Sequence, residues 1–158
     1  MWSPDGGRIA FFDVNTSDVF IFQPDKPWNG QELMKLQQPP APMSAFTPLD
    51  WSPDGQRLAG GTFADGVALY SVSSRRYELV ATTLHGISSA VWLPDSRRLL
   101  VSSAPGKLNV VDTVSGKSVE ILSVGPDNVS EVAVSRDGRR LWFGRGSTQG
   151  DSWMATLK

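Results

Sequence analysis

Apolar residues along this chain gather in short runs of four to six, separated by polar stretches rich in Gly, Pro, Asp and Ser. Runs of this length between turn residues are typical of β-strands, and no segment keeps the 3.6-residue period of a helix. Most runs are continuously apolar rather than alternating, as expected for sheets covered on both faces. The pattern therefore predicts an all-β protein built from many short strands.

The strands recur around a repeated turn. It reads Trp-Ser-Pro-Asp-Gly at 2–6 and at 51–55, Trp-Leu-Pro-Asp-Ser at 92–96, and Val-Ser-Arg-Asp-Gly at 134–138. The four aspartates are spaced 49, 41 and 42 residues apart, close to the period of about 40–50 residues of β-propeller blades. Motif and period together predict a propeller with one hairpin per blade.

The residue types of the turn explain its shape. Pro presets φ at the first corner, Asp accepts hydrogen bonds from nearby amides, and Gly takes a positive φ. Ser96 replaces Gly in the third copy and Arg136 replaces Pro in the fourth, so we expect these two turns to be less strongly preset. The aspartates fall one to a blade, which marks them as turn residues rather than ligands of a shared metal ion.

Each copy continues in the same order. The strand before the turn is expected at 46–51, 87–92 and 129–134, and the strand after it at 8–12, 57–62, 98–103 and 140–145. A third strand is expected at 19–22, 67–70, 108–111 and 152–157, and a fourth at 32–36, 77–81 and 119–122. These strands divide the chain into blades over about 1–38, 46–82, 87–122 and 129–158.

The first and last blades lack strands, so the count is about 3.5 to 4 four-stranded antiparallel blades. An open arc exposes sheet edges that natural proteins cover. We therefore expect an incomplete ring: the C-terminal part of a longer propeller, or an arc that pairs with a second copy as a homodimer. The rival is a closed four-bladed ring in which Met1-Trp2 serves as a short inner strand.

The segment Trp-Ser-Pro-Asp-Gly-x-Arg-Ile-Ala-Phe at 2–11 resembles the hairpin of bacterial WD-like propeller repeats. Such repeats occur in TolB-like proteins and in propellers attached to bacterial serine/threonine kinases and peptidases. The resemblance covers essentially the whole chain. It implies a β-propeller that binds or senses, and it implies no particular substrate, since fold does not fix function.

Composition removes several classes of function. The 158 residues carry a net charge of −1, and acidic and basic residues are interspersed. The sequence therefore lacks the cluster of basic residues that binds a nucleic-acid backbone. Cysteine is absent, which excludes disulfides and a thiol nucleophile. No apolar run approaches the roughly 20 residues of a membrane span, and the first residues do not resemble a signal peptide. The compartment stays open, with the bacterial periplasm or cell envelope favoured over the cytoplasm.

Few residues stand out as candidates for a binding face. Asp13, Asp18, Asp65 and Asp151 lie in loops between second and third strands, on one face of the predicted propeller. His85, the single histidine, precedes an inner strand and has no identifiable catalytic partners. Trp28 lies between turn residues, where it either folds back over the blade edge or contacts a partner. The other tryptophans fall in predicted strands and are expected to pack in the core.

These features predict a non-catalytic binding or scaffold module that presents loop faces to a protein or peptide partner. The alternative is a sensor or gating domain of a larger bacterial enzyme, either a serine/threonine kinase or a peptidase. No catalytic residue, cofactor or metal ion is expected, and the protein is not expected to be an enzyme in its own right.

Overall fold

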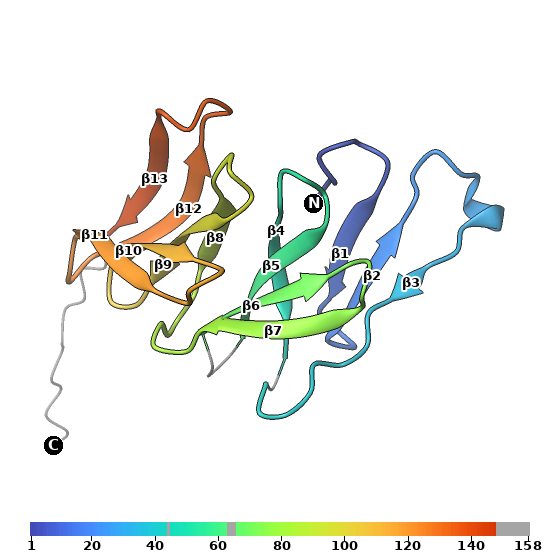
Figure 1. Cartoon of the computed structure of the whole chain (residues 1–158), viewed down its shortest axis with the longest axis horizontal. Helices are drawn as coiled ribbons and strands as arrows, with labels where there is room; N and C mark the ends of the chain where they lie inside the picture. The colour runs from blue at the N-terminus through green and yellow to red at the C-terminus, as the bar shows by residue number, and fades with distance from the viewer. Residues whose placement is uncertain (44, 63–65, 148–158) are drawn as a thin grey trace, which may run out of the picture.

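A computed structural model of the chain describes residues 1–43, 45–62 and 66–147. Within these ranges the strands form four antiparallel sheets, one for each copy of the repeated turn. The sheets stand in a row in chain order (Figure 1). The all-β fold expected from the sequence is confirmed.

The two middle sheets each have four strands. The second sheet runs β4 (Thr47–Trp51), β5 (Arg57–Thr62), β6 (Gly66–Ser71) and β7 (Arg76–Ala81). The third runs β8 (Ser89–Trp92), β9 (Arg98–Ser103), β10 (Lys107–Asp112) and β11 (Ser118–Ser123). Both follow the up-and-down order of a propeller blade.

The two end sheets are smaller. The first contains β1 (Ile9–Asp13), β2 (Asp18–Phe22) and the two-residue β3 (Met34–Lys35), preceded by a short 3-10 helix, η1 (Trp28–Gly30). Met1-Trp2, which would be a short inner strand in the closed four-bladed ring, forms only a single bridge between Trp2 and Ile9. The fourth contains β12 (Asn128–Val134) and β13 (Leu141–Gly146). The strand predicted at 152–157 lies outside the described residues.

The sheets pack face to face in sequence order. Inner strand β4 contacts both β1 and β8, and β8 contacts β12. In the described part of the chain no sheet joins strands of the first and last repeats, so the arc is open and the closed four-bladed ring is not seen (Figure 1). The expectation of an incomplete propeller is confirmed.

Each sheet therefore has an upstream face, toward the preceding sheet, and a downstream face, toward the following one. Alternation along each strand sends neighbouring residues to opposite faces. The first interface joins downstream residues of the first sheet to upstream residues of the second: Ala10, Val19, Ile21 and Leu36 with Trp51, Leu58, Ala68 and Tyr70. The second interface joins Ala59, Val67 and Leu69 to Trp92, Leu99, Val101 and Val111. Blade-to-blade packing therefore forms the core.

The hairpin turns have the expected geometry. Gly6 has φ of 71°, and Asp5 Oδ1 accepts a hydrogen bond of 3.0 Å from the Gly7 amide. Ser96 also takes a positive φ, 53°, although it is not Gly. The serine of the motif also has a part in the turn, because its hydroxyl donates to the turn aspartate, as Ser3 does to Asp5 at 2.6 Å. This bond, together with that from Gly7, lowers the pKa of Asp5.

One expectation about the core was wrong. Trp51 and Trp92 are buried, but Trp2 is 60 % and Trp142 53 % exposed. Both exposed rings lie on end sheets, where the described residues supply no neighbouring sheet on the relevant side. Strand position alone did not decide burial, because a neighbouring blade and not the tryptophan's own blade covers the ring.

Candidate functional site

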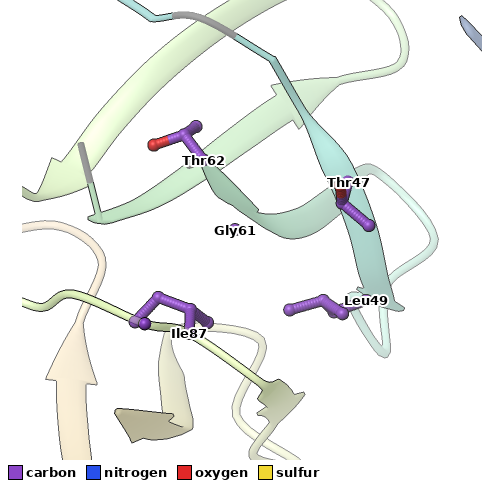
Figure 2. Close-up of a pocket in the computed structure, with 6 residues that line it drawn as sticks. Thr47, Leu49, Gly61, Thr62 and Ile87 are labelled. Carbon is purple, nitrogen blue, oxygen red and sulfur yellow. The ribbon is translucent and has the colours of Figure 1, made fainter. Parts of the chain in front are cut away.

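A cleft of about 210 Å³ opens between the second and third sheets, next to their inner strands. Figure 2 shows Thr47 and Leu49 on one side, Ile87 opposite them, and the end of β5 between. The lining residues are Thr47, Leu49, Gly61, Thr62, Gly86 and Ile87. The cleft is mostly apolar, with threonine hydroxyls at its edge, and it suits an apolar side chain of a ligand.

Two local features open this cleft. The register of β4 against β5 shifts between Pro48 and Asp50, which places Leu49 in a β-bulge. The Leu49 side chain points into the cleft (Figure 2). Gly61 on the downstream face of β5 provides the floor, because a Cβ there would lie 3.3 Å from the Cβ of Ile87. Any larger residue at 61 would therefore fill the space.

Asp50 lies beside the cleft on β4 and links the two inner strands. Its Oδ2 accepts a 2.8 Å hydrogen bond from the backbone amide of Trp92, and its Oδ1 accepts one of 2.9 Å from Trp51. Burial raises the pKa of this carboxyl, and the two amide bonds offset part of the rise. Perturbed carboxyls of this kind gather at functional sites, yet both oxygens of Asp50 already accept backbone hydrogen bonds, one within β4 and one from the next blade.

The sequence-predicted candidates do not meet at one place. Asp13 accepts bonds from Asn15 and Thr16 in its own turn, which lower its pKa. Asp18 is paired with Lys35 at 2.7 Å, and this pairing lowers its pKa. Both belong to the β1–β2 hairpin. Asp65 and Asp151 lie outside the described residues, so the ring of acids proposed for one face stays a prediction.

The two remaining candidates are exposed. Trp28 on η1 is 78 % exposed and does not fold back over the blade edge. The exposed His85 directly precedes Gly86 and Ile87 of the cleft, and its carbonyl accepts a 3.0 Å bond from the Ala104 amide. Their part in binding stays a prediction.

Sequence reasoning missed Asp50 and the cleft. Two signals for them were present in the sequence: the Gly60-Gly61 pair, and an acid one residue before Trp51, which is buried. In the described residues no three His, Cys, Asp or Glu side chains are grouped to hold a metal ion. The same part of the chain has no helix of the length and apolar character needed to cross a membrane.

Comparisons with known proteins support the fold and change the functional picture. TolB from Acinetobacter baumannii superposes with a TM-score of 0.65 at 21 % identity, over 94 % of this chain and 37 % of TolB. The chain is also 28 % identical over 159 aligned residues to the uncharacterized peptidase YuxL of Bacillus subtilis. That match covers 90 % of this chain and 22 % of the relative. No protein-family model matches the chain.

The resemblance to a TolB-like propeller is confirmed at the level of fold. The expectation that the protein is not an enzyme was wrong, because a relative matched over nearly the whole chain is named a peptidase. That expectation came from the lack of catalytic residues within 158 positions. The chain spans about a fifth of the relative's length, so those positions say nothing of the remaining four-fifths.

Proposed function

We propose that this chain is the propeller portion of a longer peptidase-like hydrolase, and that it helps select or admit the peptide substrate. One observation carries the proposal: the 28 % identity to a named peptidase over 90 % of the chain and only 22 % of the relative. It favours the peptidase over the kinase as the larger enzyme. A location in the bacterial periplasm or cell envelope stays a prediction.

Within such an enzyme the chain's own contribution is binding. The cleft between the second and third sheets offers an apolar subsite, with Leu49 and Ile87 facing each other across the Gly61 floor. An apolar side chain of a peptide fits a pocket of about 210 Å³. The nearby inner strands hold this cleft in place through the Asp50–Trp92 hydrogen bond.

The test is steady-state hydrolysis of short peptides by the full-length gene product, as made and as the Gly61→Val variant. Valine fills the cleft, so KM should rise about tenfold for peptides with a large apolar side chain, the scale of losing one such contact. Peptides with only small side chains should show unchanged KM. Gly30→Val is the matched control, because nothing lies within 4 Å of a Cβ at Gly30.

Two results would count against the proposal. A full-length product that hydrolyses no peptide refutes the peptidase assignment. Hydrolysis with the same KM for Gly61→Val and Gly30→Val refutes the part given to the cleft. Urea unfolding of each variant separates a filled cleft from a damaged fold.

A further inference from the structure

The upstream face of the first sheet is an exposed aromatic surface. It consists of Trp2, Ile9, Phe11, Phe20 and Phe22, which the strand register places on one side. Phe11 stacks on Phe20 at 5.3 Å and meets Phe22 edge-on at 6.0 Å. Trp2 is 60 % and Phe11 37 % exposed. In Figure 1 this sheet stands at one end of the row of sheets. Contiguous apolar patches of this kind mark interaction surfaces.

The equivalent face of the second sheet is covered by the sheet that precedes it. Its equivalents of Trp2, Ile9 and Phe22 are Trp51, Leu58 and Tyr70, which are 3 %, 0 % and 1 % exposed. They are buried against the downstream face of the preceding sheet. The third sheet repeats the arrangement with Trp92 and Leu99. Equivalent positions are therefore covered wherever the chain supplies a preceding blade.

A specific contact accompanies each covered tryptophan. The Arg8 guanidinium lies 4.9 Å from the Trp51 ring centroid and donates to the Gly55 carbonyl at 3.2 Å. The Arg57 guanidinium lies 4.7 Å from the Trp92 ring and donates to the Ser96 carbonyl. Ser96 occupies the same turn position as Gly55.

The last copy lacks the ring that receives this arginine. Val134 replaces the tryptophan, and Arg98 pairs with Asp95 of its own turn at 2.6 Å. The arginine of one blade thus reaches into the next blade only where a tryptophan receives it.

We propose that the upstream face of the first sheet binds one further propeller blade of the same polypeptide, with a hairpin arginine that stacks on Trp2 and donates to the Gly6 carbonyl. The inference rests on the proposed function in one respect: both require that this chain is part of a longer polypeptide. A second copy of this chain is a poorer occupant. The downstream face of the fourth sheet carries Trp142, where the three covered downstream faces have the smaller Ala10, Ala59 and Leu100.

The absence of cysteine from these 158 residues permits a direct test by thiol labelling. Phe11→Cys places a thiol in the aromatic surface, and Val119→Cys is the control, since Val119 is 62 % exposed on the outer strand β11. Both thiols should react fast in the 158-residue chain. In the full-length product Cys at 11 should react at least about 100-fold more slowly, while Cys at 119 should keep its rate.

Each other outcome overturns the proposal. Equal labelling at position 11 in both proteins means that no blade covers the face. Protection already in the 158-residue chain, with a doubled solution mass, assigns the face to a second copy. A gene product of only these 158 residues leaves no blade to bind. The labelling needs no peptide substrate, so its failure is separate from a failure of the peptidase assignment.

A second variant guards against a fold damaged at position 11. Trp2→Ser should leave the melting temperature of the 158-residue chain unchanged, because the ring is 60 % exposed there. It should lower the melting temperature of the full-length product by several degrees. Trp28→Ser, which removes a ring that is 78 % exposed, should change neither. Equal effects of Trp2→Ser on the two proteins would contradict the proposed contact.

Discussion

The contact between Arg57 and Trp92 offers the sharpest prediction about stability. Replacing Arg57 with Ala removes a guanidinium 4.7 Å from the ring centroid and its bond to the Ser96 carbonyl. A partly desolvated cation–π contact contributes about 1 kcal/mol, and a hydrogen bond from a charged donor about 1.5 kcal/mol. The variant should lose about 2.5 kcal/mol of unfolding free energy in urea.

Arg98→Ala is the matched control, because Arg98 occupies the same position of the repeat. Its guanidinium pairs with Asp95 of its own turn and is 53 % exposed, so the loss should be about 0.5 kcal/mol or less. A double-mutant cycle of Arg57→Ala with Trp92→Leu should return a coupling of about 1 kcal/mol. Equal losses for the two arginine variants, or a coupling near zero, would refute the argument that the arginine joins adjacent blades.

Two further predictions concern the second sheet. The pKa of Asp50 is higher in the folded protein than the value of 3.8 of an unperturbed Asp. Its contribution to the free energy of unfolding is therefore present below pH 3.8 and is lost as the pH rises through the pKa of the folded state. The stability of Asp50→Asn relative to the unmodified protein should therefore improve from about pH 3.5 to about pH 7 in urea titrations, and a flat difference would contradict the sign. Gly66 has φ of 88°, and a Cβ there would lie 1.7 Å from the Ala81 carbonyl oxygen. Gly66→Ala should cost about 2 kcal/mol or more, whereas Gly30→Ala, with open space around it, should change the midpoint little.

The fold was predictable because the residue types of the repeated turn determine its conformation. Pro, Asp and Gly at fixed places specify the hairpin, and the period specifies the blade. The sequence could not show which tryptophans are buried. Trp2 and Trp51 sit in the same motif, but only Trp51 has a preceding sheet against it.

The candidate site was less predictable for a related reason. The cleft depends on Gly61 of one sheet facing Ile87 of the connection to the next, and on a bulge that turns Leu49. Neither the spacing nor the residue types reveal a contact between strands of different blades. Asp50 likewise looks like an ordinary strand acid until the amide of Trp92 is found 2.8 Å from its carboxylate. Local rules specify the blades, whereas the cleft arises where two blades meet.

A structure of the full-length gene product is the most direct test of the claim that this open arc is part of a longer propeller. We expect a further blade against the first sheet, with an arginine guanidinium about 5 Å from the Trp2 ring centroid, within the usual reach of a cation–π contact. A Trp2 ring that lies in solvent, or under an element that is not a propeller blade, would contradict it.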